Sequence, residues 1–153
     1  MEARLDYAKL APDAMRALYS LGAYLAKCGL EHPLLELVKI RASQINGCAY
    51  CIDMHTKDAR AAGETEQRIY ALNAWRETPF FSDRERAALA WTEAVTRIGE
   101  GVTEALFAEV SGEFSEKELA DLTWAVAAIN AWNRVAISFR SVPGVYQPKR
   151  PGV

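Results

Sequence analysis

The sequence predicts an all-α protein, a single-domain helical bundle of about seven helices that spans residues 1–153. Apolar residues recur at three- and four-residue spacing along most of the chain, which is typical of amphipathic helices. Several segments begin with a serine or threonine cap, and glycine or proline interrupts the pattern between them. No segment alternates apolar and polar residues over the length that a β-sheet requires. The 153 residues also match the length of one domain, ~150 residues.

Four helices are predicted in the first half of the chain. Pro12 and Pro33 suit the first turn of a helix, where a missing N–H has no partner to lose. Gly29 and Gly63 stand where a helix would stop, and Asn46 is a candidate cap for the third helix. The apolar spacing and these signals together predict helices over 12–28, 33–45, 46–63 and 65–76.

Three further helices are predicted in the second half. Ser82–Glu85 and Ser115–Glu118 are capping-box patterns, and Thr103 is a candidate cap for a short helix between them. The last helix, which extends to about Arg140, is rich in alanine, valine, isoleucine and tryptophan. It is therefore expected to be buried on most sides, as a central core helix or a subunit interface. Three prolines follow it and indicate a non-helical tail over 141–153.

Composition and charge exclude several classes of protein. The 18 lysine and arginine residues nearly balance the 20 acidic ones, which argues against a nucleic-acid partner. The longest uncharged stretch, Leu122–Asn133, is too short to span a membrane, and the N-terminus lacks the pattern of a signal peptide. Three cysteines are too few for a disulfide-stapled secreted domain. We therefore expect a cytoplasmic protein, in which a close cysteine pair is typical of catalysis or metal binding.

The segment 36–55 contains the residues with the clearest chemical potential. On a helix, Cys48, Cys51 and His55 face the same way, because residues three and four apart share a face. The thiols lie near a predicted helix N-terminus, whose partial positive charge favours a thiolate. His55 can accept the proton of Cys51, and Cys48 can close a disulfide with an oxidised Cys51. Glu36, from the preceding predicted helix, can orient His55 or take its proton.

Other functions for these residues stay open. A zinc site would use both thiols and the imidazole as three ligands, with Cys28 or His32 as the fourth. A redox-sensing module, in which the pair switches the state of a partner, would use the same thiols. Cysteines are also common core residues, and core packing on the first predicted helix is the expected role of Cys28. His32 is expected in a solvated turn.

The segment 36–55 resembles the core motif of the alkylhydroperoxidase AhpD-like family, within the carboxymuconolactone decarboxylase-like superfamily. The motif is a glutamate, eleven residues, a cysteine, two residues, a second cysteine, three residues and a histidine. Its four positions are occupied here by Glu36, Cys48, Cys51 and His55. The resemblance implies an all-helical fold and a thiol-dependent peroxidase that reduces hydrogen peroxide or organic hydroperoxides in antioxidant defence. This chemistry uses no cofactor and no metal.

The resemblance also implies a role for each residue. Cys51 attacks the peroxide, Cys48 converts the sulfenic acid into a disulfide, and His55 and Glu36 relay the proton of the attacking thiol. A dithiol reductant, either a protein or a small thiol, then re-reduces the pair, and family members assemble as trimers or hexamers. Tyr50 is a departure, because the best-characterised peroxidases of the family have a histidine just before the second cysteine. The superfamily also contains decarboxylases, so a lactone or carbocyclic substrate is an alternative.

Overall fold

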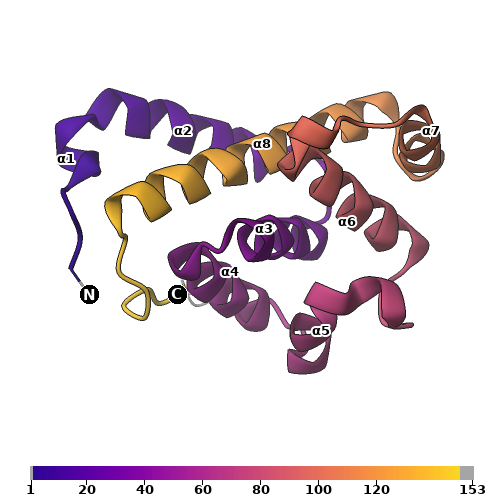
Figure 1. Cartoon of the computed structure of the whole chain (residues 1–153), viewed down its shortest axis with the longest axis horizontal. Coiled ribbons are helices and arrows are strands. Elements are labelled where there is room, and N and C mark those ends of the chain that lie inside the picture. The colour runs from indigo at the N-terminus through magenta and orange to yellow at the C-terminus, as the bar shows by residue number, and fades with distance from the viewer. Residues whose placement is uncertain (1, 149–153) are drawn as a thin grey trace.

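Helix α3 lies at the centre of the molecule, and α4, α6 and α8 pack around it (Figure 1). The computed structural model describes residues 2–148, and within this range it contains eight α-helices, two 3₁₀ helices and no strand. The predicted all-α fold is therefore confirmed, and the additional helix is the single turn α1. The elements are α1 (Tyr7–Leu10), α2 (Pro12–Leu25), α3 (His32–Asn46), α4 (Ala49–Ala61), α5 (Glu66–Ala71), η1 (Leu72–Glu77), α6 (Asp83–Thr96), η2 (Ile98–Glu100), α7 (Glu104–Glu113) and α8 (Glu116–Phe139).

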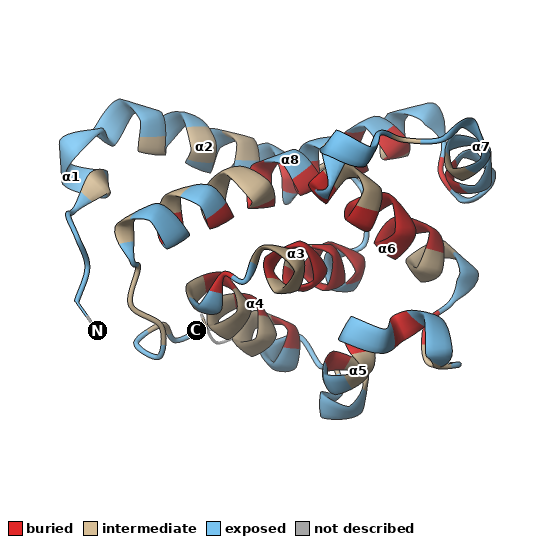
Figure 2. Cartoon of the chain, in the orientation of Figure 1, coloured by how far each residue is buried: buried red, intermediate tan, exposed pale blue. Residues whose placement is uncertain are grey.

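Helix α3 is buried along most of its length (Figure 2). Leu37, Val38 and Ile40 are 0% exposed, so apolar side chains leave this helix in several directions and all find neighbours. It packs against α4, α6 and α8. Such a helix is stable in the interior, because exposure would leave these apolar side chains in water. Glu36, one of the four candidate site residues, thus belongs to this buried helix.

Within the single chain, one face of helix α8 is exposed, so α8 is not the central core helix that was one alternative, while the subunit interface that was the other stays a prediction. One face packs into the core through Leu122, Val126 and Ile129. The other face is open, and Trp124 there is 57% exposed. Alanine buries little area, so an alanine-rich composition does not reveal which faces of a helix are covered.

In the described part of the chain, no helix is long and apolar enough to cross a membrane.

Side-chain caps set the starts of four later helices, and the caps at Ser82, Thr103 and Ser115 were predicted. Capping boxes are present at Ser82 and Ser115, where the serine and the glutamate three residues later satisfy each other's backbone N–H. Thr65 and Thr103 each accept a hydrogen bond from the backbone N–H three residues on. These contacts are local in sequence, and four helix starts follow from them directly.

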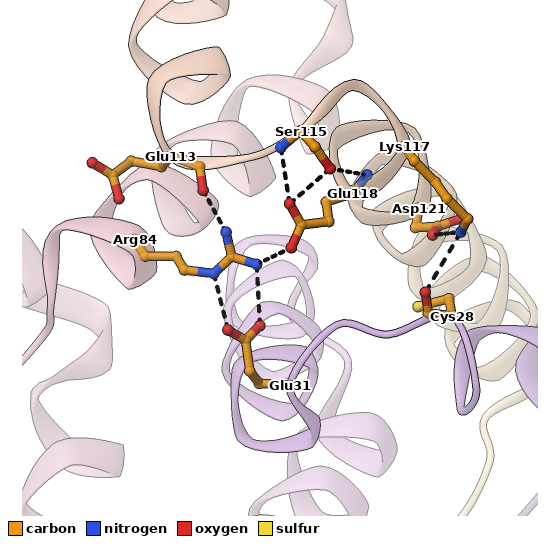
Figure 3. A network of polar contacts seen from close by, with 8 residues as sticks. All are labelled: Cys28, Glu31, Arg84, Glu113, Ser115, Lys117, Glu118 and Asp121. Atoms are coloured by element: carbon orange, nitrogen blue, oxygen red, sulfur yellow. Dashed lines mark hydrogen bonds and ion pairs between the residues drawn. The ribbon is translucent and has the colours of Figure 1, made fainter.

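A polar network ties the start of α8 to α3 and α6 (Figure 3). The guanidinium of Arg84 donates to Glu118 Oε1 at 2.6 Å and to Glu31 Oε1 at 3.0 Å. Lys117 Nζ lies 3.5 Å from the backbone carbonyl oxygen of Cys28. The backbone of Cys28 thus contacts the first turn of α8, and its side chain packs against the hydrophobic core.

Three boundaries differ from the prediction. The helix predicted over 12–28 ends at Leu25, so Cys28 lies in the turn that follows. Asn46 is not a cap but the last residue of α3, because Gly47 takes a left-handed conformation with φ 70° and ends the helix there. The helix predicted over 65–76 is divided into α5 and the 3₁₀ helix η1.

The chain after α8 is non-helical over 141–148, as predicted, whereas 149–153 lie outside the described residues. This segment lies along α4, where the Tyr146 hydroxyl donates to Asp58 Oδ1 at 2.7 Å. The carboxylate of Asp58 and burial both raise the pKa of Tyr146, which is therefore a neutral hydrogen-bond donor at physiological pH. The contact joins the end of the chain to the helix that carries the cysteine pair.

Candidate active site

The turn between α3 and α4 positions the two cysteines. Cys48 is the N-cap of α4, and its Sγ accepts a hydrogen bond from the backbone N–H of Cys51 at 3.3 Å. The two sulfurs are joined in a disulfide, with a Cα–Cα separation of 5.4 Å. This separation lies in the range that disulfides bridge without backbone movement, ~4.4–6.8 Å. Both residues are buried, in a small cluster with Ile129 and Ala136 of α8.

His55 lies one turn beyond Cys51 and contacts a buried carboxylate. Its Nδ1 is 2.9 Å from Glu36 Oε2, and the other oxygen of Glu36 is 2.7 Å from Lys39 Nζ. Burial opposes the ionisation of Glu36, but the hydrogen bond from His55 and the charge of Lys39 outweigh burial and lower its pKa to about 2. Glu36 is therefore a carboxylate at neutral pH.

The Glu36 carboxylate determines which nitrogen of His55 carries a proton. A carboxylate only accepts hydrogen bonds, so Nδ1 of His55 must be the donor in this contact. In the neutral imidazole, Nε2 then has a free lone pair. The pair of residues thus holds a proton acceptor in a fixed orientation, on the same helix as the thiols.

Cys51 and His55 line one cavity of about 290 Å³. Cys48 is not among the described residues that line it, although it is bonded to Cys51. The wall combines side chains from α1, α2, α3, α4 and α8, which come from both ends of the chain. The lining residues are Tyr7, Leu18, Tyr19, Gly22, Leu25, Ala26, His32, Leu35, Lys39, Tyr50, Cys51, Met54, His55, Ala125, Ala128, Ile129, Trp132 and Ala136.

The structure brings together the four residues that the sequence singled out, Glu36, Cys48, Cys51 and His55. Tyr50, the departure from the family pattern, lines the cavity and is partly buried, and burial raises the pKa of its hydroxyl.

The first turn of α3 contributes to the site in a way that the sequence did not indicate. His32 is its first residue and not part of a turn, but its side chain is 61% exposed, as expected, and its Nε2 lies 3.8 Å from Glu36 Oε1. Lys39 was missed altogether. Its position three residues after Glu36, on the same helix face, is the signal that could have identified it.

The thiols do not form a cluster of metal ligands in this structure. Within the described residues, Glu36, His55 and Asp58 are the acidic, histidine and cysteine side chains close enough to share an ion, within 4.8 Å of one another. Neither Cys48 nor Cys51 belongs to this group, and their sulfurs are bonded to each other.

The helical bundle and the cysteine pair beside a histidine–glutamate contact define an AhpD-like protein. The chain belongs to the carboxymuconolactone decarboxylase family, whose profile matches residues 12–94. It is 43% identical to the uncharacterized protein YdfG of Bacillus subtilis (strain 168) over 139 residues, which cover 90% of this chain and 95% of YdfG.

Solved structures agree with this assignment. One is a protein of unknown function from Agrobacterium tumefaciens whose name includes the words antioxidant defence protein AhpD. It is 44% identical to this chain with a TM-score of 0.91, and the match covers 95% of this chain and 100% of that one. The debrominase Bmp8 in complex with 2,3,4-tribromopyrrole is 20% identical with a TM-score of 0.81, over 90% of this chain and 74% of that one. At this identity, the likeness to Bmp8 concerns the fold alone.

Proposed function

We propose that the protein is a thiol-dependent peroxidase that reduces hydroperoxides through the Cys48–Cys51 pair, in antioxidant defence. The observation that supports this most directly is that Cys51 and His55 line one cavity. At the same time, the buried carboxylate of Glu36 accepts a hydrogen bond from Nδ1 of His55. A nucleophile, a proton acceptor and a group that orients the acceptor are the parts that nucleophilic catalysis requires. The name of the Agrobacterium relative points to the same function.

The two cysteines have different roles in this proposal. Cys51 is the attacking thiol, because it lines the cavity where a hydroperoxide would bind, and the imidazole of His55 lies one turn away on the same face. Cys48 is the resolving thiol, because it is placed to bond with Cys51 without any movement of the backbone.

The reaction balances with thiol chemistry alone. His55 takes the proton of the Cys51 thiol, and the thiolate attacks the outer peroxide oxygen of ROOH. The O–O bond breaks, Cys51 becomes a sulfenic acid, and the alkoxide takes the proton from His55 and leaves as ROH. The Cys48 thiol then attacks the Cys51 sulfur, which releases water and forms the disulfide. A dithiol reductant returns two electrons and two protons, so that one hydroperoxide consumes one dithiol.

The reductant and the assembly are also part of the proposal. Both cysteines are buried in the single chain, so the reductant must be a small dithiol or a protein that inserts a narrow segment. We expect a homo-oligomer, because α2 and the outer face of α8 leave large apolar side chains in solvent, and the resemblance to the family implies a trimer or hexamer. The exposed side chains include Tyr19, Tyr24 and Trp124.

The proposal is tested by adding hydroperoxide to the fully reduced protein and following the Cys48–Cys51 peptide by mass spectrometry. Disulfide is expected within seconds at micromolar peroxide. Cys51→Ser should abolish peroxide consumption. Cys48→Ser should still consume one equivalent and accumulate a sulfenic acid that dimedone traps.

Cys28→Ser is the matched control, because Cys28 lies in the contacts near the start of α8 and not at the cavity. This variant should oxidise at the wild-type rate. Thiols that stay reduced in the wild-type protein, or consumption that persists in Cys51→Ser, would overturn the proposed function.

A further inference from the structure

The cavity at Cys51 is apolar over most of its wall and basic at one edge. Leucine, isoleucine, methionine, alanine and aromatic side chains form the apolar part. Lys39 and His32 form the basic edge, and no aspartate or glutamate is among the described residues that line the cavity. A wall of this kind suits a ligand that is apolar along its length and negatively charged at one end.

The basic edge has unused hydrogen-bonding capacity. Within the described part of the chain, Lys39 Nζ has one acceptor, Glu36 Oε1 at 2.7 Å, so two of its three N–H groups have no protein partner. His32 Nε2 lies 3.8 Å from the same oxygen, which places this ring nitrogen and the Lys39 ammonium close enough to contact one ligand carboxylate together. The Lys39 side chain is 26% exposed and that of His32 is 61% exposed, so both remain accessible to a ligand.

The size of the cavity indicates the length of the apolar part. About 290 Å³ holds on the order of ten groups the size of a water molecule or a methylene, since each occupies ~30 Å³. Hydrogen peroxide would fill only a small fraction of this space and would gain nothing from the apolar wall.

We infer that the substrate is an amphipathic organic hydroperoxide of the fatty-acid type, an apolar chain that ends in a carboxylate. Lys39 is the residue that determines this specificity, and His32 is a second contact to the carboxylate. The inference names the substrate class of the proposed peroxidase and therefore rests on that function. The hydroperoxide group lies at Cys51 while the carboxylate lies at the basic edge.

Ligand binding to the oxidised protein tests the substrate class without any catalysis. Isothermal titration calorimetry with decanoate and with decan-1-ol compares two chains that differ in charge. We expect decanoate to bind about tenfold more tightly than decan-1-ol. The reason is that its carboxylate accepts a hydrogen bond from the charged, partly exposed ammonium group of Lys39. Lys39→Met should reduce this preference to nearly one, and His32→Gln should reduce it in part.

Lys57→Met is the matched control. Lys57 also pairs with a carboxylate, that of Asp53 at 3.0 Å, and its side chain is 30% exposed, but it does not line the cavity. This variant should keep the tenfold preference. Equal binding of the two ligands, absence of binding by both, or a preference that survives in Lys39→Met would overturn the inference.

A kinetic comparison separates this inference from the proposed function. The reduced protein is mixed with 10-hydroperoxydecanoic acid or with its methyl ester, and Cys48–Cys51 disulfide formation is followed. A higher second-order rate for the free acid, lost in Lys39→Met, supports both proposals. If neither hydroperoxide oxidises the pair, the peroxidase function and its substrate fail, even where decanoate still binds through Lys39. If both hydroperoxides react equally fast, the peroxidase function stands and the specificity is refuted.

Discussion

Replacing Glu36 with glutamine should destabilise the protein by ~3 kcal/mol at neutral pH. The pKa of Glu36 is lowered from 4.5 to about 2 in the folded protein, and each pH unit of this difference corresponds to ~1.36 kcal/mol. The side chain is only 3% exposed, so solvent screens these interactions little. Because the pKa is lowered, the stabilisation is complete above pH ~4.5 and is lost as the pH falls toward about 2.

Urea unfolding of the oxidised protein at two pH values measures this contribution. The free energy of unfolding of Glu36→Gln should fall below that of the wild type by ~3 kcal/mol at pH 7 but by only ~1 kcal/mol at pH 3. Glu109→Gln, an exposed position on α7, is the control and should change stability by less than ~0.5 kcal/mol. A difference for Glu36→Gln that is the same at both pH values would refute the electrostatic argument.

Three further predictions concern the core, a helix cap and the proton acceptor. Asn133 is 0% exposed and connects Asn46 and Ser43, so Asn133→Ala should lower the free energy of unfolding by ~2–3 kcal/mol in urea titrations. A loss below ~0.5 kcal/mol would contradict this. Ser115→Ala removes a capping box and should cost ~1 kcal/mol in the same assay, whereas an unchanged midpoint would show that the cap is dispensable. His55→Ala should slow peroxide-dependent disulfide formation ~100-fold in rapid-mixing experiments, and wild-type kinetics would exclude its role as the base.

Helix starts were predictable from the sequence because their signals are local. Thr65, Ser82, Thr103 and Ser115 each bond to a backbone N–H only three residues away. Helix ends and exposed faces were less predictable. Asn46 suits a cap by residue type, but its amide nitrogen donates to Asn130 and Asn133 on α8, residues that only the fold brings near.

Buried charges were the part of the core that the sequence did not reveal. Arg41 and Glu93 are both nearly inaccessible, with Arg41 Nε 2.8 Å from Glu93 Oε1. Trp75 Nε1 donates to the same oxygen at 2.9 Å. Burial alone would raise the pKa of Glu93. The hydrogen bonds from Trp75, Arg76 and Arg41 outweigh burial and lower this pKa below its usual value, so the carboxylate stays ionised. The partners are 18 and 52 residues away from Glu93 in sequence, and no spacing rule links them.

The sequence alone determined that this chain is helical and that Cys51 and His55 share one helix face, because helical periodicity fixes both. The tertiary structure decided the rest of the site. Packing of α3 against α4 brings Glu36 to His55, and packing of α2 and α8 over them forms a cavity that Cys51 lines and Cys48 does not. The physical reason is that periodicity relates neighbours along one helix, whereas a cavity depends on side chains of helices that meet only in the folded bundle.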